Sequence, residues 1–139
     1  PAISSEYWRL LGRNFLTYQE LGEHDRYHTA FFRAIHDGGR TFTDQESLSA
    51  FYEQLGGEKQ AYINAFNSVG VASELSKADS MARRLKVAMV PSVVVQGKYL
   101  VRTSGSVGPK RMLDVMDYLL AKELAERENN ETRTSTLKN

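Results

Sequence analysis

In roughly the first 85 residues, apolar positions recur three and four residues apart, which is the spacing of helices that each bury one face. The first predicted helix follows Ser4-Ser5-Glu6, whose hydroxyls can cap it, and ends at Gly22. Its inward face consists of six apolar residues: Tyr7, Trp8, Leu10, Leu11, Phe15 and Tyr18. The same spacing predicts four more helices, over residues 27–36, 43–55, 58–66 and 73–85. Short glycine-marked turns separate them, so the pattern predicts a compact helical bundle.

Three details of these helices can be checked against a structure. Thr43 and Glu46 stand three residues apart before an apolar run, which predicts a capping box made by their side chains. Phe31 and Phe32 are adjacent and cannot both point inward, so one of them is expected to line a groove or an interface. The aromatic residues of the first helix are expected to belong to the core and not to a ligand cage.

The pattern changes at Ser92-Val93-Val94-Val95, where apolar β-branched residues follow one another without alternation. A continuous run of this kind is typical of a strand that is covered on both faces. Gln96-Gly97-Lys98 supplies a tight turn, and Tyr99-Leu100-Val101 returns as a second strand. The sequence therefore predicts one short β hairpin in a chain that is otherwise mostly α.

A lone hairpin is marginally stable in water, and a strand such as 93–95 is expected to have neighbours on both sides. The sequence supplies one neighbour, so the other backbone edge is predicted to be open, as a site for pairing with a peptide or with a second copy of the chain. The simplest expectation is that the missing strands precede Pro1, and the chain begins with Pro and not Met. The alternative is that a helix covers the edge.

A last helix is predicted from Pro109 to about Arg127. Its inward residues are expected to be Met112, Leu113, Val115, Met116, Leu119 and Leu120. Residues 128–139 are polar and are predicted to be disordered. The chain thus divides into a helical region over 1–86, a hairpin and helix over 87–127, and a tail over 128–139.

Composition narrows the possible chemistry. The formal net charge of +1 gives no bulk field that would favour nucleic acid or an anionic membrane. No apolar run approaches the ~20 residues that a membrane span needs, and no secretory signal is present. The sequence contains no cysteine, which excludes disulfides, thiolate zinc sites and cysteine nucleophiles within these 139 residues.

Val90 and Pro91 are the candidate binding residues. Pro91 has no N–H and therefore suits the first residue of a strand. From the dipeptide alone a trans bond is expected, because most X-Pro bonds are trans. A cis bond would turn the backbone so that the N–H and carbonyl of Val90 face outward, where they could pair with an extended peptide.

The histidines are candidate metal ligands by their spacing. His24 and His28 are four residues apart, as zinc ligands on a helix can be. No Cys or Glu lies in a matching position, and Gly22 and Asp25 suggest that His24 lies in a turn. Surface histidines are therefore expected, with no metal site and no cofactor.

The segment Met89-Val90-Pro91-Ser92, followed by Val93 to Tyr99, resembles the Val-Pro, apolar strand and Asn/Gln-Gly-Lys-Tyr segment of DsbA-type thiol:disulfide oxidoreductases. The upstream helices are similar to those of the same family, and the resemblance extends over about residues 1–126. It implies a thioredoxin-like fold with an inserted helical domain. Residues 1–86 would be the insertion, and 87–127 would be the C-terminal part of a thioredoxin-like domain with an incomplete sheet.

The resemblance also implies roles for the candidate residues. Pro91 would be the cis-proline that packs across from the redox cysteines, and the backbone of Val90 would bind the extended substrate by strand addition. Family members oxidise substrate dithiols through a mixed disulfide, which requires a thiolate. This chain lacks the Cys-x-x-Cys motif, so it would hold half of a binding groove and no catalytic residue, and it should be inactive alone.

For a complete family member, the resemblance implies disulfide formation in exported proteins in the bacterial periplasm. The partners would be unfolded or extended polypeptides and a membrane quinone-linked reoxidant, with no nucleic acid. Two alternatives stay open. One is a natural cysteine-free interaction module that docks a partner strand, and the other is a relative such as a kappa-class glutathione transferase or isomerase, with a serine nucleophile before Pro1.

Overall fold

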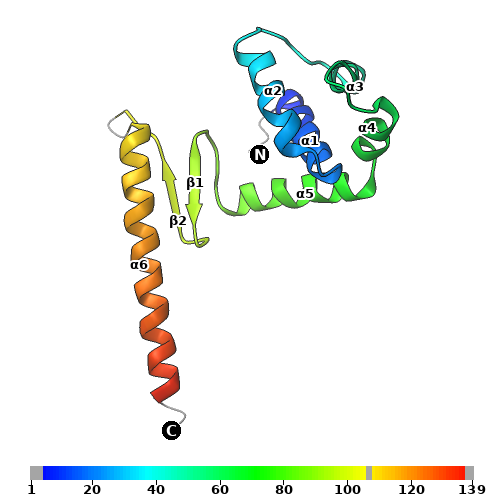
Figure 1. Ribbon diagram of the computed structural model, residues 1–139. Helices are drawn as coiled ribbons and strands as arrows, with labels where there is room; N and C mark the ends of the chain where they lie inside the picture. Colours follow the sequence, from blue (N-terminus) through cyan, green and yellow to red (C-terminus); the bar gives the residue numbers. More distant parts are fainter. Residues whose placement is uncertain (1–4, 106–107, 137–139) are drawn as a thin grey trace. The chain divides into compact units, whose positions relative to one another are not determined.

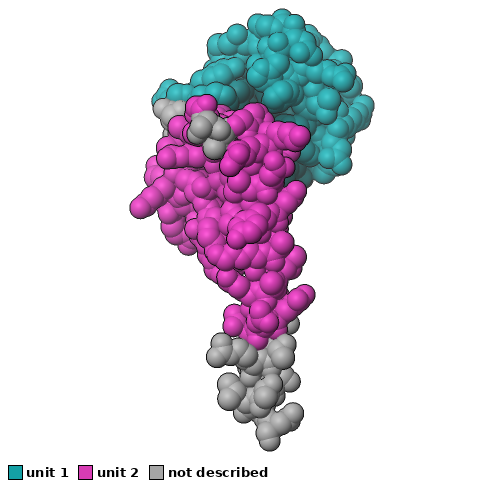
Figure 2. Space-filling model, turned by 90° about the vertical axis from the view of Figure 1, so that its left-hand side faces the viewer, with its two compact units in different colours: residues 1–82 teal, residues 83–139 magenta. Residues whose placement is uncertain are grey.

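The computed structural model describes residues 5–105 and 108–136, and the chain forms two compact units, residues 1–82 and 83–139 (Figure 2). Helices dominate, and a single two-stranded sheet is present in the described part of the chain. The first unit is built from helices that follow one another through short turns (Figure 1). These helices are α1 (Glu6–Glu20), α2 (His24–His36), α3 (Gln45–Gln54), α4 (Lys59–Phe66) and α5 (Val69–Arg84), whose last residues belong to the second unit. The mostly helical fold class is confirmed.

Capping side chains explain where several helices begin. The Ser5 hydroxyl accepts a hydrogen bond from the Trp8 N–H, as the sequence predicts for α1. α5 begins at Val69 and not near Ser73, because the Ser68 hydroxyl accepts from the Val71 N–H at 3.0 Å. α2 begins at His24, so the prediction that His24 lies in a turn is wrong.

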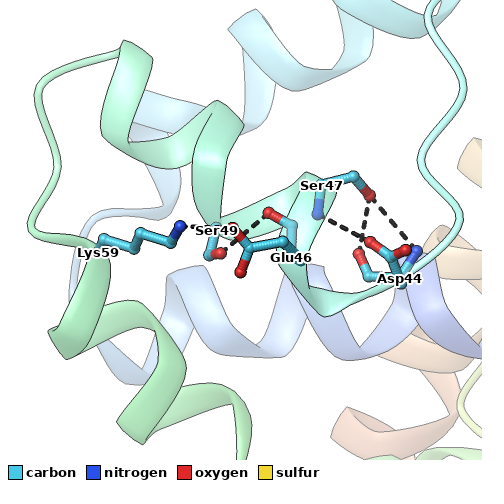
Figure 3. Close-up of polar contacts among 5 residues, drawn as sticks. All are labelled: Asp44, Glu46, Ser47, Ser49 and Lys59. Atoms are coloured by element: carbon cyan, nitrogen blue, oxygen red, sulfur yellow. Dashed lines mark hydrogen bonds and ion pairs between the residues drawn. The ribbon is translucent and has the colours of Figure 1, made fainter.

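The predicted capping box at the start of α3 is displaced by one residue. Asp44, and not Thr43, caps the helix, and its carboxylate accepts from the Ser47 N–H at 2.8 Å (Figure 3). The Ser47 hydroxyl in turn lies 3.4 Å from the Asp44 N–H. Glu46, the predicted partner of Thr43, forms an ion pair with Lys59 instead. A carboxylate at the cap accepts hydrogen bonds from the free N–H groups and also interacts favourably with the positive end of the helix dipole. These two effects explain why Asp44 and not Thr43 is the cap.

The core of the first unit is strongly aromatic. Its buried residues are Tyr18, Tyr27, Phe31, Phe42, Leu48, Phe51, Tyr52, Tyr62 and Phe66. The Tyr62 hydroxyl donates to Asn14 Oδ1 at 2.7 Å, and the Tyr52 hydroxyl donates to the Glu23 carboxylate. Burial raises the pKa of Tyr18 to about 12. The Tyr18 hydroxyl therefore stays protonated, and the hydroxyls of Tyr52 and Tyr62 act as hydrogen-bond donors.

The expectation that all the aromatic residues of α1 belong to the core is wrong. Tyr18 is fully buried, but Trp8 is 49% exposed and Phe15 is 36% exposed. Apolar residues cover more of the circumference of α1 than its neighbours can contact, so the rings of Tyr7, Trp8 and Phe15 line a surface hollow of about 200 Å³. Phe32 of α2 lines the same hollow and is 55% exposed, whereas Phe31 is buried. The prediction that the two adjacent phenylalanines point in different directions is confirmed.

The second unit contains the predicted hairpin. Strands β1 (Ser92–Val95) and β2 (Tyr99–Arg102) are antiparallel. The register pairs Ser92 with Arg102, Val93 with Val101, Val94 with Leu100 and Val95 with Tyr99. Gln96 and Gly97 both have positive φ, of 50° and 69°, and the Lys98 N–H bonds to the Val95 carbonyl to close the turn.

Helix α6 (Pro109–Thr136) packs against one face of this hairpin. The small core between them contains Val95, Val101 and Met112, with Val93, Tyr99, Met116 and Leu119 packed around it. On the other face of the hairpin, the paired residues Val94 and Leu100 are half-buried.

Two predictions about α6 are corrected. Leu113, Val115 and Leu120 were expected to point inward but are exposed, because one helix on one sheet face buries only the stripe that includes Met112 and Met116. The helix also continues to Thr136, whereas disorder was predicted from residue 128. Extending an existing helix gains one hydrogen bond for each residue fixed, and this gain offsets the low helix propensity of the Asn and Thr residues in this stretch. Residues 137–139 lie outside the described part of the chain. Among the described residues, no helix is both long enough and apolar enough to cross a membrane.

Candidate functional site

The residues that the sequence singles out lie together at the entrance to β1. Val90 is 74% exposed, and Pro91 beside it is also exposed. The peptide bond between them is cis, which is the isomer implied by the family resemblance. The Ser92 hydroxyl donates to the Met89 carbonyl at 2.5 Å, so a local side-chain bond spans the two residues. The structure therefore presents the Val90 backbone on the surface directly before the strand.

The main chain of this segment is available for pairing. In the described part of the chain, β1 pairs with β2 along one edge, and no strand pairs with its other edge. Neither the N–H nor the carbonyl of Val90 has a hydrogen-bond partner among the described residues. In an antiparallel strand, alternate residues direct their backbone groups to opposite edges. Half of the backbone groups of β1 therefore face away from β2. They continue the row of free backbone groups that begins at Val90.

Apolar side chains accompany this open edge. Met89 is 46% exposed and, like Val90, lies in the irregular segment between α5 and β1. No charged side chain lies between Val87 and Val95 in the sequence. The segment thus offers hydrogen-bonding groups together with apolar contact area, which is the combination that strand addition uses for affinity.

Sequence reasoning missed the contacts that hold the hairpin to α6. Lys98 in the turn pairs with Glu123 of α6 at 2.7 Å, and the Glu123 side chain is only 6% exposed. The carboxylate of Glu123 raises the pKa of Lys98. Lys122 donates to the Tyr99 hydroxyl at 3.2 Å, and this contact raises the pKa of Lys122. Glu123 falls on the same α6 stripe as Met112 and Met116, which is the one sequence signal that could have indicated it.

The histidines do not form a metal centre with other ligands in the described residues, where no group of three or more metal-binding side chains is found. The rings of His24 and His28 stack with their centres 4.6 Å apart. Burial lowers the pKa of His28, and the neighbouring His24 lowers it further. The neutral form of His28 is therefore favoured. Both histidines belong to the first unit, whereas β1 belongs to the second.

Comparison with known proteins identifies the fold. The DSBA-like thioredoxin domain model matches residues 7–119. The thiol:disulfide interchange protein DsbA of Azotobacter vinelandii is 35% identical over 123 residues, which are 88% of this chain and 58% of that protein. The protein of the same name from Pseudomonas aeruginosa is 34% identical over 126 residues, which are 90% of this chain and 59% of that protein. The chain thus spans little more than half the length of these relatives.

Solved structures agree with this result. A crystal structure of Pseudomonas aeruginosa DsbA has a TM-score of 0.84 and 33% identity, over 92% of this chain and 67% of that one. The structure of the oxidoreductase DsbA from Xylella fastidiosa has a TM-score of 0.78 and 29% identity, and the match covers 90% of this chain and 67% of that one. The match includes both the helices of the first unit and the hairpin and helix of the second. The chain belongs to the DSBA-like thioredoxin domain family.

Proposed function

We propose that the open edge of β1, together with the backbone of Val90, binds extended polypeptides, as the substrate-docking part of a thiol:disulfide oxidoreductase. The observation that carries the proposal is the main chain from Val90 into β1, whose outer edge pairs with no strand in the described part of the chain. Pairing through main-chain hydrogen bonds depends little on the side chains of the bound peptide, so it can accommodate peptides of many sequences. That property suits a protein whose substrates are unfolded chains.

The docking role is separable from the redox step. Dithiol oxidation requires a thiolate that forms a mixed disulfide with the substrate, and the sequence contains no cysteine. The residues present can hold a polypeptide but cannot exchange a disulfide. We expect insulin-reduction and dithiol-oxidation assays on this chain to give rates equal to buffer, and a rate above buffer would contradict this assignment.

In a complete family member, the proposed activity is disulfide formation in exported proteins of the bacterial periplasm, with reoxidation by a membrane quinone-linked partner. The helical unit is proposed to be the insertion in the thioredoxin-like domain to which β1, β2 and α6 belong. A cysteine-free interaction module remains the second candidate, because the open edge and the lack of cysteine suit it equally. It would bind one defined partner strand, whereas a docking site for unfolded substrates should bind many peptides with similar affinity.

A peptide titration tests the binding claim. The change is Val90→Pro, which removes the N–H that is proposed to pair with the peptide, and Ala88→Pro is the matched control in the same exposed segment. Loss of one hydrogen bond is worth about 0.5–1.5 kcal/mol, so we expect Val90→Pro to weaken binding by about two- to tenfold in fluorescence anisotropy. Equal affinity for the two variants would argue against main-chain pairing at Val90.

A second copy of the chain can occupy the same edge. We propose that two chains pair through β1 when no peptide is present, because an exposed strand edge is a template for pairing. Sedimentation at increasing concentration should then show a dimer that dissociates when an extended peptide is added. A monomer at all concentrations, or a dimer that is indifferent to the peptide, would contradict this pairing.

A further inference from the structure

A second hollow is formed entirely by residues of the first unit, whereas β1 belongs to the second. It has a volume of about 340 Å³ and is lined by α1, α4 and α5. Two arginines one helical turn apart on α1, Arg9 and Arg13, line it together with the buried side chains of Phe66 and Leu75. The hollow therefore combines cationic groups with apolar surface, which is the usual make-up of a site for a small ligand that has one polar end.

Arg13 is held in place by neutral groups. Its Nε donates to the Phe66 carbonyl at 2.8 Å, and its guanidinium carbon lies 4.6 Å from the centre of the Phe66 ring. No carboxylate pairs with Arg13 among the described residues, and the side chain is half-buried. Because only Nε is used in this contact, the two Nη groups of the guanidinium remain able to donate to a carboxylate.

The other charges around the hollow are already arranged in pairs or lie at its edge. Arg9 Nη1 donates to Asp79 Oδ2 at 3.1 Å, and the Asp79 side chain is only 10% exposed. Glu6, which also lines the hollow, is exposed and has no ion-pair partner among the described residues. Because Asp79 pairs with Arg9, Arg13 is the cation lining this hollow to which the described residues supply no ion-pair partner. The site is suited to one negative charge.

We infer that this hollow binds a carboxylate that carries an apolar chain. The carboxylate pairs with Arg13, and the chain lies on Phe66, Leu75 and Leu10. The ligand has two sources with the same chemistry, namely a free amphiphilic acid and the C-terminal residue of a peptide that ends in an apolar side chain. This site is independent of the proposed pairing at Val90, which requires no chain end.

Nuclear magnetic resonance titrations of the whole chain with octanoate and with octan-1-ol test the inference. Octanoate should shift the Arg13 Nε–H and Leu75 methyl signals saturably. Octan-1-ol cannot form the charge-assisted hydrogen bonds that a carboxylate forms with Arg13, so we expect it to bind the unaltered chain about tenfold more weakly than octanoate does. For the same reason, octanoate should bind Arg13→Gln about tenfold more weakly than it binds the unaltered chain. The octanoate affinity of Arg13→Lys should lie between those of the unaltered chain and Arg13→Gln. Glu6→Gln should bind octanoate more tightly than the unaltered chain does. Arg33→Gln, which removes an exposed cation of α2 that does not line the hollow, is the matched control and should leave the affinity unchanged.

Equal affinity for octanoate and octan-1-ol on the unaltered chain would overturn the inference, and so would the absence of saturable shifts. These two measurements need no variant and hold even if Arg13→Gln unfolds, which circular dichroism would show. A short peptide ending in leucine, compared with its C-terminal amide, separates the two sources. If the peptide with a free C-terminal carboxylate binds and its amide does not, the ligand is a peptide C-terminus. If octanoate binds and neither peptide does, the ligand is a free amphiphilic acid.

Discussion

At the scale of single residues, function and stability depend on how each polar group is satisfied. The backbone of Val90 stands out because its N–H and carbonyl lack partners among the described residues on an exposed surface. By contrast, the buried hydroxyl of Tyr62 in the aromatic core donates to Asn14. The local pattern of the sequence indicated Val90 and Pro91. It could not indicate the Tyr62–Asn14 pair, because those residues are far apart in the chain and meet only after folding.

Replacing Tyr62 tests the buried hydrogen bond. Tyr62→Phe removes the hydroxyl and leaves the buried Asn14 oxygen without a partner, which costs about 1–3 kcal/mol of the free energy of unfolding. Urea denaturation measures this loss. Tyr118→Phe, at a position that is 69% exposed, is the control and should change the midpoint little. Similar midpoints for the two variants would show that the hydrogen bond does not stabilise the core.

The cap of α3 predicts a response to acid. Hydrogen bonds from the backbone and side chain of Ser47 hold the pKa of the Asp44 carboxyl below its ordinary value. A carboxyl with a depressed pKa in the folded state stabilises the protein above its unfolded pKa, near 4, and this stabilisation is lost as the pH falls through the folded value. Thermal midpoints of the unaltered chain should therefore drop more below about pH 4 than those of Asp44→Asn. Parallel pH profiles for the two chains would contradict this.

At the scale of elements, the sequence predicts best where the signal is local. The hairpin, with its turn at Gln96 and Gly97, lies where the pattern predicts it, and α1 begins behind the expected Ser5 cap. The start of α5 and the end of α6 differ from the prediction because the Ser68 cap and helix propagation outweigh the apolar pattern. α2 begins three residues before the predicted start, at His24, without a side-chain cap. The burial of Trp8 and Phe15 was wrong for another reason, since which apolar residues of a helix face are covered depends on neighbours that the local pattern does not specify.

The contact between the hairpin and α6 can be tested through Lys98 and Glu123. Lys98→Met leaves the buried Glu123 carboxylate without its partner, whereas Glu123→Gln removes the buried charge. We expect the unfolding midpoint to fall more for Lys98→Met, and Glu123→Gln to restore part of that loss in the double variant. Losses that simply add in the double variant would mean that the pair does not hold the hairpin to α6.

At the scale of the whole molecule, family membership and composition define what this chain can contribute. Its fold matches the DSBA-like thioredoxin domain over residues 7–119, yet its sequence contains no thiol. The resemblance seen in the sequence from Met89 to Tyr99 is confirmed by these comparisons. The proposed role of the β1 edge is to pair with the main chain of an extended polypeptide.

Hydrogen exchange of backbone amides, measured with and without an extended peptide, tests that role most directly. We predict that the peptide slows exchange at Val90 and at alternate residues of β1, while the amides of β2 and of the helical unit exchange as before. Binding of the peptide without protection at Val90 and β1, or with protection confined to the helical unit, would contradict the account.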